Sequence, residues 1–107
     1  MSTNMHCIAH GYNVECAERQ MEYLKSTGEV DNVNWAFGHV LRLLERYPSQ
    51  GLTPDAKNAI AKVKRAYDSD GVSGALVHFD WLRRSLEYLG SCEINDTLEI
   101  ISNKLTA

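Results

Sequence analysis

The sequence predicts an all-α fold, a single compact bundle of about five amphipathic helices with short connections. Apolar residues recur at the helical period, and no segment shows the strict alternation of a half-buried strand. The only two prolines, Pro48 and Pro54, stand together at a clear break between periodic segments. Gly28, Gly71 and Gly90 mark the remaining breaks. Short connections between such helices favour antiparallel neighbours, and therefore a bundle.

The first predicted helix runs from about Val14 to Ser26, and the second from about Asn32 to Tyr47. Asn13 and Asp31 are suitable N-caps because their side chains accept hydrogen bonds from free amides of a first turn. Gly28 is placed to end the first helix, and Pro48 stops the second. The inward stripes are Val14, Ala17, Met21 and Leu24 in the first helix, and Val33, Phe37, Val40, Leu44 and Tyr47 in the second.

The third predicted helix has the strongest start signal, with Thr53 as cap, Pro54 in the first helical position and Asp55 at the positive end of the helix dipole. A fourth helix is predicted from Asp70 or Ser73 to about Leu89. A fifth is predicted from about Ile94 to Leu105, with Asn95 or Asp96 as an alternative cap. The inward stripes are Ala56, Ala59, Ile60, Val63 and Tyr67, then Val72, Ala75, Leu76, Phe79, Leu82, Leu86 and Leu89, then Ile94, Leu98, Ile101 and Leu105.

Length and composition predict one domain over residues 1–107, with residues 1–12 as an irregular N-terminal arm. The 44% apolar and 23% charged residues are typical of a globular protein, and the net charge of −3 provides no general attraction to nucleic acid. The first residues do not resemble a secretory signal, and no run approaches the length of a membrane span. The three cysteines are too few for a disulfide framework. We therefore expect a cytoplasmic protein without a membrane partner.

Two of the predicted helices carry a second apolar face, and this pattern predicts a protein-binding surface. A helix that is apolar over more than one stripe must be covered on more than one side. Tryptophan, tyrosine and arginine are also the residues enriched at interface hot spots. The alternative is that the two helices are the central pair and are covered within the same chain. The residues of the second faces are Trp35, His39, Leu43, Val77, Trp81, Arg84 and Tyr88.

Two glycines, Gly38 and Gly74, fall inside or near these two helices. A glycine inside a helix costs about 1 kcal/mol relative to alanine. We therefore expect a packing reason for them, such as the close approach of another backbone.

Basic side chains on the third and fourth helices support an alternative function, a nucleic-acid-associated regulator. Such a patch would contact phosphates, and the turn between the two helices allows a helix-turn-helix arrangement. Against this interpretation, the chain is net acidic, and a charged solvent face explains the same residues. They are Lys57, Lys62, Lys64, Arg65, Arg83 and Arg84.

Cysteines and histidines near the N-terminus support a second alternative, a metal-binding protein. The spacing of Cys7 and His10 is ligand-like, and Cys16 would add a thiolate. The usual second pair of ligands is missing, so a fourth ligand would have to come from elsewhere in the fold. The candidates for it are His6, His39, His78 and Cys92.

The loop from Asp68 to Gly71 fails the EF-hand spacing, because Ser73 and Phe79 occupy the positions that calcium binding requires for glycine and glutamate. No local motif supports a cysteine nucleophile. No motif identifies a family, but the length and acidic helical composition are typical of small phage-encoded inhibitors and bacterial immunity-type proteins. We expect a non-enzymatic protein-binding module without a cofactor, an inhibitor or regulator of a larger complex. Its partner would be another protein or a second copy, as in a homodimer.

Overall fold

The computed structural model describes residues 14–105, and within this range the chain forms α-helices and two short 3-10 turns, with no strand. The Cα radius of gyration is 12.9 Å, the value expected for one compact domain of about 100 residues. The all-α bundle predicted from the sequence is therefore confirmed. Asn13, the predicted first cap, and the predicted arm of residues 1–12 lie outside the described residues.

The first two helices are α2 (Val14–Thr27) and α3 (Val30–Arg46). Gly28 separates them with a positive φ of 77°, a conformation that favours glycine, as the sequence predicted. The cap of α3 was predicted wrongly, because Glu29 precedes the helix and Asp31 lies in its first turn. Val14 was also predicted to face inward, but its side chain is 57% exposed at the beginning of α2.

A turn with the 3-10 segment η1 (Ser49–Gly51) leads into α4 (Pro54–Asp70). The predicted start of α4 is confirmed, because Thr53 Oγ1 accepts a hydrogen bond of 3.1 Å from the backbone N–H of Ala56. On α4 the buried stripe is Ala56, Ala59 and Val63.

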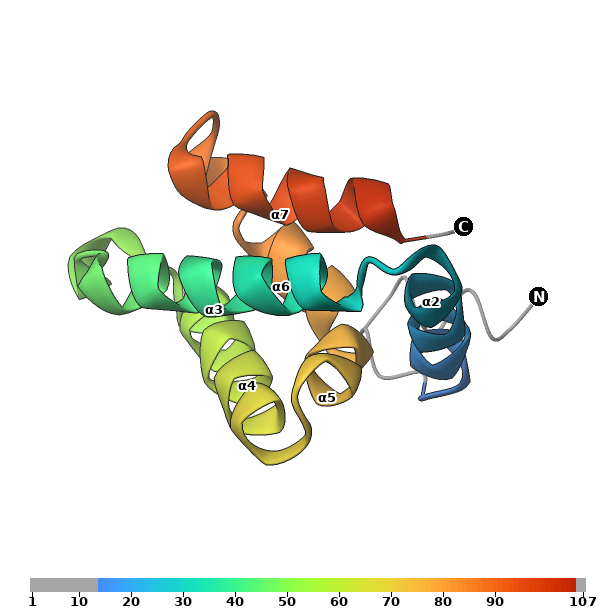
Figure 1. Ribbon diagram of the computed structural model, residues 1–107. Helices are drawn as coiled ribbons and strands as arrows, with labels where there is room; N and C mark the ends of the chain where they lie inside the picture. The colour runs from blue at the N-terminus through green and yellow to red at the C-terminus, as the bar shows by residue number, and fades with distance from the viewer. Residues whose placement is uncertain (1–13, 106–107) are drawn as a thin grey trace.

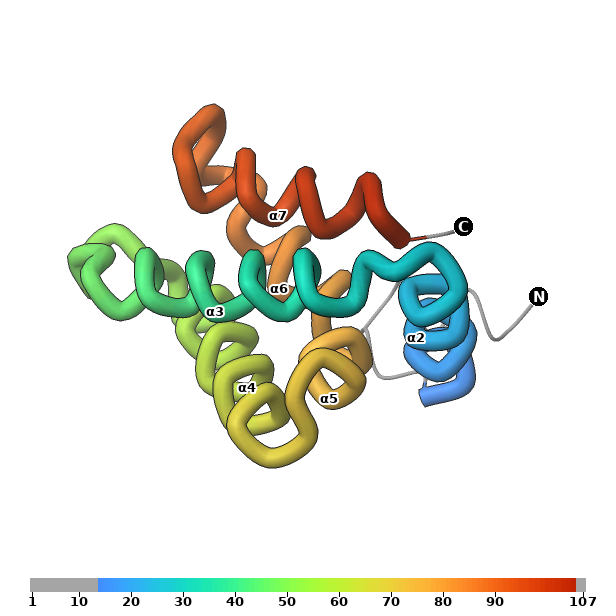
Figure 2. The backbone as a smooth tube through the Cα atoms, viewed as in Figure 1, coloured from blue at the N-terminus to red at the C-terminus, as the bar shows by residue number. Residues whose placement is uncertain are grey.

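The predicted fourth helix is not one helix. The chain instead forms α5 (Val72–Val77), α6 (Phe79–Ser85) and the 3-10 turn η2 (Glu87–Leu89). The backbone N–H of His78 bonds the carbonyl of Ala75, three residues back, so the turn tightens there and α6 begins in a new direction. In Figure 2 the chain runs from α5 through α6, which passes behind α3 in this view, to the turn before α7. The predicted apolar stripe is nevertheless buried over most of its length, from Val72 to Leu86.

The last helix is α7 (Glu93–Lys104). Asn95 and Asp96 lie inside it, so the prediction that one of them caps the helix was wrong. The Asn95 side chain instead donates to the carbonyls of Leu86 and Gly90, at 3.0 and 2.8 Å, and fastens η2 to the start of α7. Asn95 thus stabilises the turn before its own helix.

The helices surround one apolar core. Helix α7 lies beside α3 and runs in the opposite direction, whereas α4 and α5 pack below α3 and α2 lies near its first turn (Figure 1). The ring of Phe37, on α3, meets the ring of Phe79, on α6, edge to face with centroids 5.6 Å apart. Fully buried side chains from α2, α3, α4, α6 and α7, and from Leu86 between α6 and η2, complete this core, and they include Leu24, Val40, Val63, Leu82, Leu86 and Leu98.

Candidate protein-binding surface

Trp35, on α3, is the most exposed of the large apolar side chains in the described part of the chain. Its side chain is 65% exposed. One face of the indole stacks on the ring of His39, one helical turn later, with centroids 5.1 Å apart and an interplanar angle of 9°. The indole is therefore supported on one side by its own helix, while a large part of its surface remains open to solvent.

His39 connects this part of α3 to the beginning of α7. Its Nε2 atom hydrogen bonds Oε2 of Glu93 at 2.9 Å. The imidazole thus has a stacking contact on its ring face and a polar contact at its edge, which together hold its orientation. Because Trp35 stacks on this ring, the Glu93 contact also limits the positions that the indole can adopt.

Ile100, on α7, is the second exposed apolar side chain beside α3, and its side chain is 52% exposed. Its position follows from two contacts between the helices. Glu93 contacts His39 at one end of α7, and Lys104 Nζ pairs with Glu29 Oε1 at 3.0 Å at the other. Positions 93, 97, 100 and 104 form one stripe of an α-helix, so Ile100 lies between the two contacts along the border with α3.

We call Trp35, His39, Glu93 and Ile100 the α3–α7 face. Sequence reasoning predicted two of these residues, Trp35 and His39, and missed the other two. A signal for Ile100 was present, because it is an isoleucine outside the inward stripe of its helix. Glu93 carried no such signal, since its contact joins segments far apart in the sequence. Leu43, which was predicted with Trp35, is half-buried against the core.

The other four predicted partner-binding residues lie on α5, α6 and η2, and two of them contact the start of α4. The indole Nε1–H of Trp81 donates to Oδ1 of Asp55 at 3.2 Å. The hydroxyl of Tyr88 donates to the Gly51 carbonyl at 2.8 Å and accepts from the Thr53 amide at 3.1 Å. These contacts fasten both side chains to the chain's own backbone and carboxylate groups, and Trp81 is half-buried, whereas the Tyr88 side chain remains 50% exposed. Val77 is half-buried against the core, and Arg84 is exposed.

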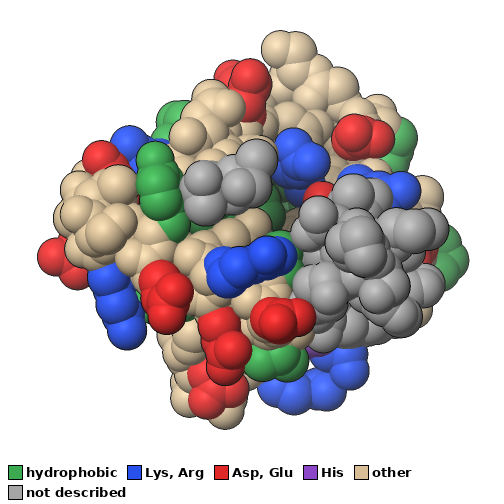
Figure 3. All heavy atoms as spheres, turned by 90° about the vertical axis from the view of Figure 1, so that its right-hand side faces the viewer, with side chains coloured by type: hydrophobic (Ala, Val, Ile, Leu, Met, Phe, Trp, Pro, Cys, Tyr) green, Lys and Arg blue, Asp and Glu red, His purple; other side chains and the backbone are tan. Residues whose placement is uncertain are grey.

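The basic residues of the nucleic-acid alternative are spread over several sides of the molecule. Lys64 pairs with Glu45 of α3 at 2.7 Å, and this hydrogen bond, with the attraction between the charges, raises the pKa of Lys64. Lys62 lies on the opposite flank of α4, near His78. Lys57 and Arg65 are exposed. On the side of the molecule that Figure 3 shows, which is the right-hand side of Figure 1, acidic and basic side chains are interspersed.

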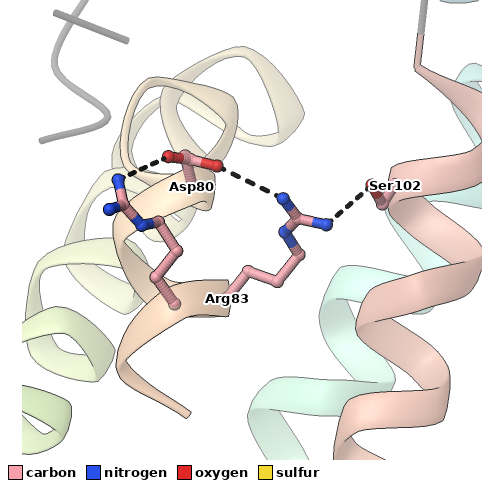
Figure 4. Close-up of polar contacts among 4 residues, drawn as sticks. Asp80, Arg83 and Ser102 are labelled. Carbon is pink, nitrogen blue, oxygen red and sulfur yellow. Dashed lines mark hydrogen bonds and ion pairs between the residues drawn. The ribbon is translucent and has the colours of Figure 1, made fainter. Parts of the chain in front are cut away.

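The two arginines of α6 share one carboxylate. Asp80 Oδ1 lies 3.5 Å from Arg83, and Asp80 Oδ2 lies 3.5 Å from Arg84. Arg83 also donates to the Ser102 hydroxyl of α7 at 3.2 Å, so its guanidinium bridges two helices (Figure 4). Both arginines therefore have an acidic partner within the chain, and this partner competes with any phosphate group that would bind them.

The metal alternative falls largely outside the described residues, because Cys7, His6 and His10 belong to the first 13 positions. Within residues 14–105, no group of three or more histidine, cysteine or acidic side chains is arranged to hold a metal ion. Cys16 and Cys92 are not joined in a disulfide, and both are half-buried. Burial, and to a lesser degree the charge of Lys62, lowers the pKa of the His78 imidazole below its ordinary value.

Comparison with known proteins adds no relative to these observations. No family model matches the chain, and no curated protein or solved structure is significantly similar to it. Among the described residues, no helix combines the length and apolar character that crossing a membrane requires. A functional interpretation therefore depends on the surface of the molecule itself.

Proposed function

We propose that this chain is a non-enzymatic protein-binding module whose contact surface is the α3–α7 face. The observation that carries the proposal is Trp35, an indole that is 65% exposed yet held in place by the His39 ring. Holding a large aromatic side chain in water forgoes the stabilisation of about 1.5–3 kcal/mol that burying a large apolar side chain provides. A partner that covers the indole recovers this free energy.

The arrangement also reduces the entropic cost of binding. A side chain that is already oriented loses less freedom when a partner covers it, and immobilising a flexible one costs about 0.5–1.5 kcal/mol. His39 and Glu93 provide this orientation from two helices. Ile100, 52% exposed on the adjacent helix α7, adds a second apolar group to the face. By occupying the surface of a larger assembly, such a module would act as an inhibitor or regulator.

Affinity capture from the native cell, with variants matched for chemistry, tests this proposal. Tagged wild-type, Trp35→Ala and Tyr23→Ala chains are compared, and each captured protein is identified and bound again in purified form. Tyr23 is the control because it is an aromatic side chain of α2 with 41% exposure, outside the α3–α7 face. We expect Trp35→Ala to weaken binding at least about thirtyfold, as at a hot spot. Equal binding by all three chains would show that the face is not the contact surface.

A nucleic-acid function has less support, because three of the six predicted cations, Lys64, Arg83 and Arg84, have carboxylate partners. A gel-shift titration at low salt checks it directly, since phosphate contacts are strongest there. Binding at low salt that is lost in a Lys57→Ala, Arg65→Ala double variant would favour this function over the protein-binding module.

A further inference from the structure

We infer that the partner of the α3–α7 face is a second copy of this chain, related to the first by a two-fold axis. The inference rests on the proposed function and specifies its partner. The argument comes from the charges that surround Trp35 and Ile100. Each copy carries a pattern of acidic and basic ends that matches itself, which is the requirement for an isologous interface.

On α3, the stripe that contains Trp35 is acidic at its beginning and basic at its end. Asp31 lies one turn before Trp35, and Arg42 and Arg46 lie two and three turns after it. All three charged residues are exposed. The indole is therefore placed between a carboxylate on one side and two guanidinium groups on the other.

On α7, the stripe that contains Ile100 has the same polarity. Glu93 and Asp96, both exposed, lie in the first turn, and Lys104 lies at the end. The isoleucine is thus also placed between an acidic and a basic end. Since α3 and α7 run in opposite directions, the acidic end of each helix lies beside the basic end of the other (Figure 1).

This pattern is complementary to itself in both face-to-face arrangements that a two-fold axis allows. Where α3 of one copy lies against α3 of the other, the two run antiparallel, and Asp31 of each approaches Arg42 of the other. Where α3 lies against α7 of the other copy, Arg42 instead approaches Glu93 and Asp96. In either arrangement opposite charges meet at both ends of the face, which favours association and sets its register.

The apolar residues occupy the middle of this pattern. Trp35 and Ile100 form the centre of the face and the charged residues form its rim, which is the usual organisation of a specific interface. The 17 residues of α3 span about 25 Å, the 12 residues of α7 span about 18 Å, and each packed helix is about 9 Å wide, so the two helices together present about 390 Å² in projection. An interface of this size belongs to the small class, so we expect a dimer that forms with increasing concentration.

Sedimentation equilibrium and light scattering of the purified full chain test the inference. Between about 1 µM and about 500 µM, the range appropriate to a small interface, the mass should rise from 12.0 kDa toward twice that value. We expect Trp35→Ala and Ile100→Asp to raise the dimer dissociation constant, Trp35→Ala by at least about thirtyfold, and the control Tyr23→Ala to leave it within about twofold. Circular dichroism shows whether each variant keeps its helical fold.

Charge exchange provides a test that depends on the second copy itself. Arg42→Glu and Asp31→Lys should each weaken self-association, and a mixture of the two should restore it if α3 lies against α3. If α3 lies against α7, a mixture of Arg42→Glu with Asp96→Lys restores it instead. Restoration by either mixture supports the inference. Restoration by neither, or self-association insensitive to Arg42→Glu, overturns it.

The outcomes separate this inference from the proposed function. A purified chain that remains a monomer over the whole range overturns the second copy as partner, and so does a dimer that Trp35→Ala does not weaken. If the same chain still captures another protein through Trp35, the protein-binding module stands with a different partner. A monomer whose capture does not depend on Trp35 removes both.

Discussion

Gly38 and Gly74 occupy similar places in the sequence, within helices whose second faces are apolar, but their surroundings differ. A Cβ atom added at Gly74 would lie 2.4 Å from the carbonyl oxygen of Ala66, so α5 approaches the backbone of α4 too closely for any side chain. A Cβ at Gly38 would lie 3.6 Å from side-chain atoms of Arg42 and Tyr67, which is an ordinary van der Waals distance. The expected packing reason therefore exists at Gly74 and is absent at Gly38.

We predict opposite effects of alanine at these two positions. Gly74→Ala should lower the free energy of unfolding by about 1–3 kcal/mol, because α5 must move away from α4. Gly38→Ala should raise it by about 0.5–1 kcal/mol, because alanine favours the helix and meets only ordinary contacts. Urea unfolding followed by circular dichroism measures both. A destabilised Gly38→Ala chain, or a Gly74→Ala chain as stable as wild type, would contradict this account.

The two tryptophans also differ in ways that helical spacing alone does not reveal. Trp81 is half-buried and has a hydrogen bond to Asp55, whereas Trp35 is open to solvent. Both looked alike in the sequence, since each lies outside the inward stripe of its helix. Spacing identifies which side of a helix a residue occupies, but the presence of a neighbour on that side depends on the tertiary arrangement. The observations therefore favour the interface interpretation for Trp35 and the intramolecular one for Trp81.

At the level of elements, the starts of α2, α3, α4 and α7 and the ends of α2, α3 and α7 were predicted to within about two residues, a typical uncertainty for helix ends. Thr53, Gly28 and Pro48 produced these predictions through caps and breaks. The break at His78 has no comparable signal, because neither glycine nor proline stands there. The apolar stripe continues across it, so a single helix was the natural prediction from periodicity.

Tyr88, in η2, joins the segment after this break to the turn before α4 through two hydrogen bonds. We predict that Tyr88→Phe lowers the free energy of unfolding by about 1 kcal/mol, through loss of the hydrogen bonds to Gly51 and Thr53. Binding through the α3–α7 face should be unchanged. Trp35→Ala should show the reverse, with nearly unchanged stability and weakened binding.

Thermal unfolding and the binding assay, carried out on the same two variants, check this pair of expectations. Phenylalanine keeps the size of the Tyr88 ring, so packing is retained and only the hydroxyl is tested. If Tyr88→Phe weakened binding as strongly as Trp35→Ala, Tyr88 would be part of the contact surface, as the sequence predicted.

For the whole molecule, His78 predicts a dependence of stability on pH. Burial lowers the pKa of this imidazole below 6.5, so the folded chain favours the neutral ring. The unfolded chain therefore binds more protons as the pH falls, and the free energy of unfolding decreases from about pH 6.5 downward through the folded pKa. Well above pH 6.5 the imidazole is neutral in both the folded and the unfolded chain, so His78 makes no contribution to the pH dependence there.

Carboxylates act in a separate range. Hydrogen bonds from Asn32 and Lys64 lower the pKa of Glu29 and Glu45, respectively, below 4.5, so their stabilisation is present above that value and is lost in more acidic solution. Urea midpoints at about pH 7.5 and about pH 5.5 thus report mainly on histidines. We expect a smaller difference between the two in His78→Gln than in wild type. An identical difference would assign the dependence to another group.

The sequence predicted the fold class, but it predicted only part of the candidate site. Helical periodicity and caps are local properties, and they are sufficient for a bundle of amphipathic helices. The α3–α7 face depends on the antiparallel pairing of two helices, which no local pattern specifies. Trp35 and His39 were found because they share one helix, whereas Glu93 and Ile100 enter through the pairing.

The contact between His39 and Glu93 joins positions 54 residues apart in the chain. Neither helix alone contains the complete surface, so a peptide copied from α3 would present the indole without its neighbours from α7. During synthesis, the surface would be complete only after α7 had left the ribosome. A partner that requires both helices would therefore bind only chains in which α7 has been made and packed against α3.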